Sequence, residues 1–445
     1  MSPRPFHMAA VCPTAALFAA ALALAACRTA PTPQVGPVTG NSFVVRDVRV
    51  FDGTNTIERT NVVVHNGRIT DVGRSAPRDL PSIDGRNHTL LPGLIDAHAH
   101  IQSDAQLRDG LRFGVTTMLD MFTRPEFAAT HRSRRDSVIK TDLADMYSSG
   151  VPVTSPRGMG TQFGIPLTTI SAPGEADAIV ASRIADGSDW VKVMYEPNAG
   201  IVTTISNETL RAVSAAIKAR DKVSVVHISS ITGARDVARA GINGFAHLFS
   251  DSIITTELAA EIVRAGIFVI PTLSIHHAFE GGEFRRGLAA DPRISPWLSA
   301  PQLAAHSGPA PSKQGPMGPY LSRFSAERAM ENVRRLHSAG AKILAGDDAA
   351  SNLAAIGVSL HGEMELLTMA GLSPAEALHA ATGGPAAAFG LVDRGRIAPG
   401  ARADLLLVEG NPLEDIRATR AIVRIFKNGY EVSRTPPPAP APAPK

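Results

Sequence analysis

Two histidines with one residue between them, His98 and His100, end the apolar run 90–97 of this 445-residue chain. In an extended strand, residues i and i+2 project to the same face, so both imidazoles can bind one metal ion. A lone pair of this kind is weak evidence, because histidines at strand ends are more often surface residues. Further ligand-type residues are needed to support a metal site.

Such residues follow at the ends of later apolar runs, namely Lys192, His227, His247 and the doublet Asp347-Asp348. A lysine inside an apolar strand is expensive to bury as an ammonium. Each position alone has an ordinary structural explanation: a snorkelling lysine, core histidines, or aspartates that cap a helix. Their occurrence together and in this order predicts a metal centre.

The composition is that of a globular protein, with 44% apolar and 19% charged residues. The net charge is +3, and the basic residues are spread along the chain without a lysine run. We therefore expect no nucleic-acid partner.

The N-terminus reads as a bacterial secretory leader over residues 1–26, with an apolar stretch at 15–26. Leu24-Ala25-Ala26-Cys27 resembles a lipobox, which implies cleavage before Cys27 and lipidation of its thiol. An ordinary signal peptide or a transmembrane helix fits less well, because the apolar run is short. We expect a protein anchored on the periplasmic side of the cell envelope, touching membrane only through this lipid. Arg28 resembles the pattern for outer-membrane sorting.

Composition and predicted secondary structure divide the chain into a linker, two strand-rich ends and a long middle region. Residues 27–42 form a Pro/Thr/Gly linker, and 434–445 form a Pro/Ala tail expected to be disordered. Short strands rich in β-branched residues, with Asp-Gly and Asn-Gly turns, fill 43–90, and the same pattern of short strands and turns recurs at 395–433. We predict that these two ends pair into one small composite β-sandwich.

The middle region, 91–394, alternates short apolar strands with helical patterns such as 210–219 and 326–338. This spacing predicts an α/β fold, a (β/α)8 TIM-like barrel whose catalytic groups lie at the C-terminal ends of the strands. The stretch 274–324 is rich in Pro, Gly and His and shows little periodicity. We expect an irregular insertion on the catalytic face, either a lid or a plain solvated loop.

With these motifs, the chain resembles the amidohydrolase superfamily. Within it, the chain is similar to the binuclear branch of imidazolonepropionase-like, Xaa-Pro dipeptidase-like and ochratoxinase-like proteins. The resemblance covers nearly the whole chain after the leader. It rests on the strand-terminal residues above and on the segments 51–53, 66–69, 91–100, 114–117, 346–349 and 400–405.

The resemblance implies two divalent metal ions, with zinc suited to the donor set and manganese, cobalt or iron also compatible. His98, His100 and Asp348 would bind the first ion, and His227 and His247 the second. Lys192, carboxylated to N6-carboxylysine, would bridge them. Asp348 would act as general base and then general acid. Asp347 takes the usual threonine position of a Gly-Thr-Asp-Ala signature, which implies a supporting or capping role.

Substrate residues are less clearly marked. Tyr195 matches a family position that reaches the substrate, although a structural tyrosine explains it equally well. The segment 155–164 resembles a loop that commonly reads Gly-Gly-His-Gly, but here Met159 replaces the histidine and Arg157 the second preceding glycine. Arg157 and His276 are further candidates for substrate contact, and loop histidines are commonly structural. Asp120 and Asp404 match structural family positions.

The sequence therefore predicts a binuclear metal-dependent amidohydrolase that cleaves a C–N amide bond of a small molecule. We expect a dipeptide-like or N-acyl amino acid substrate. One alternative is a cyclic-amide hydrolase of the imidazolonepropionase type, and another is a non-catalytic metal- or ligand-binding lipoprotein. The bridging lysine argues against the mononuclear deaminase branch. The sequence leaves a homo-oligomer open.

Overall fold

The computed structural model describes residues 38–197, 199–315, 318–349 and 353–437. The predicted leader, Cys27 and most of the predicted linker lie outside these ranges. In the part of the chain described, no helix is both long and apolar enough to cross a membrane.

The N-terminal strands form a meander, as the sequence predicts. Strand β1 (Phe43–Phe51) pairs antiparallel with β2 (Thr56–His65), which pairs with β3 (Arg68–Gly73), while β4 (Ser82–Asp84) lies parallel to β1. Asn66 and Gly67 join β2 to β3, with φ of 51° and 76°. Two successive residues with positive φ form the tight hairpin that Asn-Gly favours.

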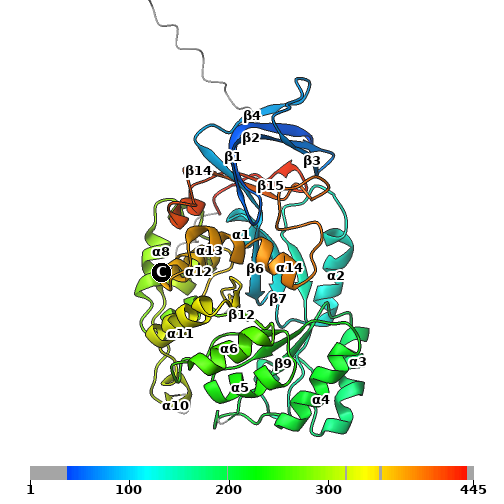
Figure 1. The fold of residues 1–445 in the computed structure, drawn as a ribbon, viewed down its shortest axis with the longest axis vertical. Helices are drawn as coiled ribbons and strands as arrows, with labels where there is room; N and C mark the ends of the chain where they lie inside the picture. The colour runs from blue at the N-terminus through cyan, green and yellow to red at the C-terminus, as the bar shows by residue number, and fades with distance from the viewer. Residues whose placement is uncertain (1–37, 198, 316–317, 350–352, 438–445) are drawn as a thin grey trace, which may run out of the picture. The chain divides into compact units, whose positions relative to one another are not determined.

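The C-terminal strands complete the same sheet. Strand β5 (His88–Pro92) pairs with β14 (Leu405–Glu409), followed by β15 (Ile422–Lys427) and β16 (Tyr430–Glu431). Figure 1 shows the blue and red strands side by side. The predicted association of the two ends is thus observed. Their strands form one hydrogen-bonded sheet of eight strands, whereas a β-sandwich consists of two sheets packed face to face.

The middle region supplies short parallel strands that are buried almost throughout. Three of them form one parallel sheet and five form another. In chain order they are β6 (Leu94–Ala99), β7 (Val115–Asp120), β8 (Asp145–Ser148), β9 (Val191–Met194), β10 (Ser224–His227), β11 (Gly244–Ala246), β12 (Phe268–Ile270) and β13 (Lys342–Ile343). The mixed α/β fold with parallel sheets agrees with the prediction.

Backbone hydrogen bonds join these two sheets at both margins. Beyond β8, Val153 donates to the carbonyl of Lys192 on β9 at 2.8 Å. At the other margin, Ala97 on β6 donates to Ala345 at 2.9 Å, and Asp348 donates to His98 at 2.8 Å. The C-terminal ends of β6 and β9 and the segment after β13 are therefore fixed relative to one another.

Helices follow most of the strands and pack around them (Figure 1). The predicted helices at 210–219 and 326–338 are observed as α4 and α11, whose N-cap residues Ser206 and Ser325 accept backbone N–H bonds. The helices outside the predicted insertion are α1 (Asp104–Arg112), α2 (Pro125–Arg135), α3 (Ala176–Ala185), α4 (Asn207–Lys218), α5 (Ile231–Arg239), α6 (Thr256–Arg264), α11 (Ala326–Ser338), α12 (Val358–Met369), α13 (Pro374–Ala380) and α14 (Gly383–Ala388).

The insertion 274–324 is largely helical, so the prediction of an irregular segment was wrong. Its helices are α7 (Leu273–Phe279), α8 (Glu283–Ala290), α9 (Ala300–Ser307) and α10 (Gly318–Leu321). Its glycines and prolines fall mainly at helix ends, where Gly282 caps α8 and Pro301 lies in the first turn of α9. Residues that looked like loop formers thus serve as boundaries of short helices.

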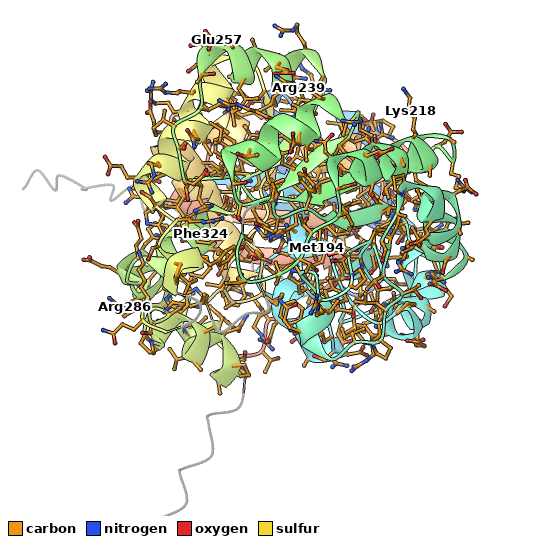
Figure 2. All side chains as sticks on the ribbon, turned by 90° about the horizontal axis from the view of Figure 1, so that it is seen from below. Met194, Lys218, Arg239, Glu257, Arg286 and Phe324 are labelled. Carbon is orange, nitrogen blue, oxygen red and sulfur yellow. The ribbon has the colours of Figure 1, made fainter. Side chains whose placement is uncertain are left out.

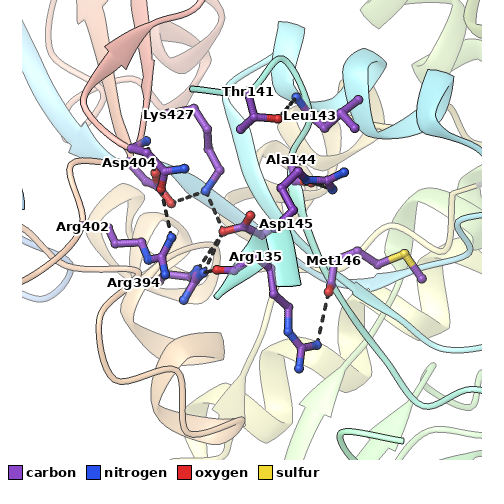
Figure 3. A network of polar contacts seen from close by, with 12 residues as sticks. Arg135, Thr141, Leu143, Ala144, Asp145, Met146, Arg394, Arg402, Asp404 and Lys427 are labelled. Atoms are coloured by element: carbon purple, nitrogen blue, oxygen red, sulfur yellow. Dashed lines mark hydrogen bonds and ion pairs between the residues drawn. The ribbon is translucent and has the colours of Figure 1, made fainter. Parts of the chain in front are cut away.

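A buried ion network links the terminal sheet to β8 (Figure 3). Lys427 Nζ on β15 lies 2.6 Å from Asp145 Oδ2 on β8 and 2.7 Å from Asp404 Oδ2, and all three side chains are at most 3% exposed. Arg394 adds a second cation at 2.8 Å from Asp145. Burial acts to raise the pKa of Asp145, but these cations hold the pKa below its usual value. Asp404 is therefore structural, as expected.

The start of the predicted tail is also packed against the fold. Arg434 lies with its guanidinium carbon 4.2 Å from the centre of the Trp297 ring. Its Nε donates to the carbonyl of Arg112 at 3.0 Å. The ordered chain therefore continues past the predicted boundary at 434.

Candidate metal centre

The four predicted histidine ligands lie at or just after the C-terminal ends of β6, β10 and β11. Lys192 is the second residue of β9, and Asp348 lies in the segment after β13. Figure 2 views the protein from the side toward which β6 runs in Figure 1. Met194, the last residue of β9, lies near the middle of this face, and Lys218 and Glu257 lie toward its periphery. The end of β9 therefore lies near the middle of the protein in this view, and the helical residues Lys218 and Glu257 lie outside it.

The first group consists of His98, His100 and Asp348. Asp348 Oδ1 lies 3.3 Å from His98 Nε2 and 3.0 Å from His100 Nε2. One ligand atom from each residue falls within 4.8 Å of the others. Burial, with a smaller contribution from Lys192, lowers the pKa of His98 to about 3, which keeps the imidazole neutral. A neutral imidazole is the form that binds metal.

The second pair, His227 and His247, lies beside the first group. Their ring centres are 4.7 Å apart, and His247 is 4.6 Å from His98. His247 Nδ1 is 2.9 Å from Thr272 Oγ1. Burial lowers the pKa of His247 well below its ordinary value, so this imidazole is also neutral.

Lys192 lines the cavity described below together with His100, His227, His247 and Asp348, and 1% of its surface is exposed. Burial lowers the pKa of Lys192 to about 7, although Asp348 and Asp120 oppose that shift. A neutral amine is a nucleophile toward carbon dioxide, whereas an ammonium is not. The burial of Lys192 therefore meets the chemical requirement for carboxylation.

The strand ends that carry the site adopt an unusual backbone conformation. His247 after β11, Thr272 after β12 and Asp348 after β13 have φ of 71°, 49° and 54°. Non-glycine residues rarely adopt positive φ, and such residues cluster at functional sites. A Cβ at Gly346 would lie 2.6 Å from the backbone nitrogen of His98, so glycine is required where this segment crosses β6. Local backbone geometry thus directs these side chains into the site.

The residues fit a pair of divalent metal ions. Four imidazoles and a carboxylate converge, and both ring nitrogens of the fully buried His98 lack a hydrogen bond. Burying such nitrogens without a partner is costly, and coordination by a metal would satisfy them. The histidines at Asp348 outweigh the effect of burial and hold the pKa of that carboxyl well below its usual range. Nitrogen and oxygen donors of this kind suit zinc.

Two buried acids missed by the sequence reading contact the predicted ligands, one in each group. Glu196, which follows β9, places Oε1 2.7 Å from His227 Nε2 and is 1% exposed. Ser229 donates to its other oxygen at 2.5 Å. Asp96 accepts the backbone N–H of His98 at 3.0 Å. The available signal was an acid close in sequence to a predicted ligand, Asp96 two residues before His98 and Glu196 four residues after Lys192.

Asp347 occupies the supporting position that the resemblance implies. Its Oδ1 accepts the backbone N–H of Ala349 at 2.9 Å, which fixes the turn carrying Asp348. Burial, reinforced by the neighbouring carboxyl of Asp96, raises the pKa of Asp347 well above its ordinary value. Burial likewise raises the pKa of Asp96 to about 7, so the two carboxyls favour sharing a proton.

A cavity of about 350 Å³ opens onto these ligands. Its polar lining consists of Gln102 and the ligand residues, except for His98. The rest of the lining is apolar and comes from Phe122 after β7, Met194 on β9 and the loop between β8 and α3, which contributes Met159, Phe163 and Ile165.

None of the three predicted substrate residues lines this cavity. Arg157 is exposed on the loop surface. Tyr195 turns its hydroxyl to Asp236 at 2.7 Å, and burial together with this carboxylate raises its pKa to about 12. His276 is 1% exposed and packs against Phe324, with ring centres 5.5 Å apart. The structure gives Tyr195 a hydrogen-bonding role and His276 a packing role.

The fold and site define a class of protein that comparison with known proteins specifies further. The model of the amidohydrolase family matches residues 89–432, so the chain belongs to that family. This confirms the resemblance stated above and, with it, the predicted class of enzyme, a hydrolase that acts on carbon–nitrogen bonds.

Individual relatives are distant. The imidazolonepropionase of Streptomyces griseus is 26% identical over 402 residues, which cover 83% of this chain and 90% of that protein. The imidazolonepropionase of Deinococcus radiodurans is 23% identical, covering 90% of this chain and 96% of the relative. A solved Xaa-Pro dipeptidase with methionine bound in its active site superposes with a TM-score of 0.69 at 20% identity. That match covers 88% of this chain and 99% of the dipeptidase.

Proposed function

We propose that the protein is a binuclear metal-dependent amidohydrolase that cleaves an amide C–N bond of a small molecule. The observation that carries this proposal is the convergence of four imidazoles, Asp348 and a buried Lys192 at one cavity. Family membership supports the reaction class. The two metals, their identity as zinc and the lysine modification are parts of the proposal.

The scaffold proposed for this site is a closed (β/α)8 barrel formed by β6 to β13. The backbone hydrogen bonds at Val153 and at Ala97 link the two parallel sheets at both margins, as such a ring requires. In barrels of this type, catalytic groups occupy the C-terminal ends of the strands. The position of the four histidines and Asp348 at or beyond those ends supports the proposal.

His98, His100 and Asp348 would hold one metal, and His227 and His247 the other. Lys192, carrying a carboxyl group added by carbon dioxide, would supply the anionic bridge. Two such ions, when bound, lower the pKa of a water molecule and polarise a carbonyl.

Asp348 moves the proton in this scheme. Its carboxylate is anionic at neutral pH because the surrounding histidines hold its pKa down. It accepts a proton from the attacking water and then donates the proton to the leaving nitrogen. One side chain thus serves both steps because it lies between the ligand groups and the cavity.

The amide class of the substrate remains open in this proposal. A dipeptide-like or N-acyl amino acid substrate carries a carboxylate. The residues expected to contact the substrate, Arg157, Tyr195 and His276, lie outside the cavity lining. A cyclic amide is a second candidate, favoured by the similarity to two imidazolonepropionases. Both reactions use the same ligand set.

We propose that the protein is held at the periplasmic face of the bacterial envelope, in the outer membrane, by a lipid on Cys27. The lipobox-like segment before Cys27 supports this proposal. Mass spectrometry of the protein from membranes tests it. A diacylglyceryl modification at Cys27 with residues 1–26 absent supports the proposal, and an unmodified N-terminus overturns it.

The function is tested by measuring metal content in the purified protein supplied with bicarbonate, together with hydrolysis of a panel of linear and cyclic amides. About two metals per chain and turnover of at least one amide support the proposal. One metal or none, with no turnover across the panel, favours the non-catalytic lipoprotein instead. The members of the panel that react distinguish the linear from the cyclic class.

A further inference from the structure

The apolar side of the cavity is a continuous wall. We use the term apolar wall for Phe122, Met159, Phe163, Ile165 and Met194. Phe122, Ile165 and Met194 belong to one packed cluster, against which Met159 also packs. The rings of Phe122 and Phe163 lie with centres 6.0 Å apart at 66°, an edge-to-face pair. These side chains line the same cavity as the predicted ligands and come from the ends of β7 and β9 and the loop between β8 and α3.

Phe163 at the rim of the wall is poorly covered by the protein itself. Its side chain is 60% exposed, the highest value among the exposed aromatic residues described. An exposed ring at the mouth of a cavity that holds ligand-type residues gains stabilisation when a second apolar surface covers it. The wall is therefore arranged to receive an apolar group.

The described lining of the same cavity supplies no arginine and only one lysine that could pair with a substrate carboxylate. Among its lining residues, Lys192 is the only lysine or arginine, and it lies among the metal ligands. The proposed function assigns that lysine to the bridge. A carboxylate placed against the wall would lose its hydration without gaining an ion pair, which is costly.

We propose that the apolar wall binds an uncharged aromatic or alkyl substituent of the scissile amide. The substrate class is then neutral aryl or alkyl amides, and the wall selects against amides with a carboxylate near the scissile bond. This inference rests on the proposed function, because it assigns the substrate of that same metal centre.

The test uses matched pairs of amides with the full-length protein, zinc and bicarbonate. The first pair is the 4-carbamoylanilide and the 4-carboxyanilide of acetic acid, which are equal in size and differ in charge. The second pair is N-methyl-phenylacetamide with a carbamoyl group or a carboxyl group at the 4-position of its ring, so the substituent lies on the acyl side of the scissile bond. We expect the neutral member of at least one pair to have a kcat/KM about tenfold or more above its charged partner, as expected when a carboxylate lacks a counter-ion.

A binding measurement separates substrate preference from turnover. Phenylacetohydroxamate and its 4-carboxy derivative both offer a metal-binding group, and calorimetry gives their affinities without any reaction. Tighter binding of the neutral hydroxamate supports the inference. Equal or tighter binding of the charged one overturns it.

Two arginine variants test whether the preference for neutral ligands arises at the apolar wall. Phe163→Arg places a cation at the rim without disturbing packed core, because the side chain is mostly exposed. We expect it to raise the affinity for the carboxylated hydroxamate relative to the neutral one by about tenfold. Met369→Arg is the matched control, because Met369 is 58% exposed on α12 and does not line the cavity.

The outcomes distinguish the inference from the proposed function. Hydrolysis with a preference for carboxylated amides retains the function and overturns the inference, as does an equal shift in Phe163→Arg and Met369→Arg. Metal binding without hydrolysis of any amide overturns the function, and the hydroxamate affinities then decide whether the wall selects apolar groups. Absence of bound metal overturns both.

Discussion

His227 Nε2 lies 2.7 Å from Glu196 Oε1, across the ends of the neighbouring strands β10 and β9. Ser229 donates to the second carboxylate oxygen, and the hydroxyl of Thr204 accepts the backbone N–H of Glu196 at 3.0 Å. A carboxylate that engages one imidazole nitrogen orients the ring and leaves the other nitrogen for a metal. Glu196 is therefore positioned to orient His227 in the candidate metal centre.

Replacing Glu196 by alanine should lower the affinity for the second metal by about 10- to 100-fold, which is the usual cost of losing a residue that orients a ligand. Glu196→Gln, which keeps an acceptor oxygen, should lose less. Zinc affinity measured by competition with a chromogenic chelator provides the test, with Thr70→Ala in the terminal sheet as a control. Unchanged affinity in Glu196→Ala would show that the contact is only structural.

Loading of the metal centre should depend on pH through Lys192. Its pKa is lowered to about 7, so the amine is largely protonated below that value and largely neutral above it. Only the neutral amine can react with carbon dioxide. Metal-free protein that is given zinc and bicarbonate should therefore regain activity faster as the pH rises from 6 to 8. Above pH 8 the rate of reactivation should level off.

Rates of reactivation at fixed dissolved carbon dioxide measure this effect. Lys192→Ala should bind fewer metals and lose the dependence on bicarbonate. Reactivation at the same rate with and without bicarbonate in the unmodified protein would contradict carboxylation.

Asp348→Asn should retain the local backbone conformation, because asparagine tolerates the positive φ of 54° found here. The amide cannot accept and return a proton as the carboxylate does. We expect kcat/KM to fall by about 10²- to 10⁴-fold, with weaker binding of the first metal. Steady-state kinetics and metal analysis test this together. Full activity would exclude Asp348 as the proton carrier.

Lys427→Met should destabilise the fold, because it leaves Asp145 and Asp404 buried without the cation that contacts both. Breaking a buried ion pair in this way costs about 3–5 kcal/mol. The free energy of unfolding in urea measures the loss. Arg239→Met is the control, because Arg239 forms an exposed pair with Glu261 and should cost less than about 1 kcal/mol. Equal losses in the two variants would contradict the assigned role of the network.

Much of the metal centre could be predicted from the sequence. The His-x-His pair ends a strand, and alternation places both side chains on one face, so periodicity alone brings His98 and His100 together. Each later ligand also ends an apolar run, which marks it as a strand terminus. The helices α4 and α11 were predictable for a similar reason, since their apolar residues repeat with helical spacing and a serine cap precedes each.

The insertion misled sequence reasoning because prolines and glycines serve both loops and helix boundaries. Gly282 and Pro301 mark helix starts here, but their composition resembles that of a loop. The apolar residues of short helices cover too few turns to show a clear period. Only packing identifies them as helices.

The sequence by itself determined the ligand types, their order along the chain and the family, because these depend on local strand patterns and motifs. Tertiary structure alone decided which other side chains contact these candidate ligands or line the same cavity. Glu196 reaches His227 through parallel pairing of two strands, and Tyr195 turns away toward Asp236 on α5. The apolar wall likewise combines residues from β9, the end of β7 and a distant loop. Contacts between such separated segments arise from packing, which no local pattern encodes.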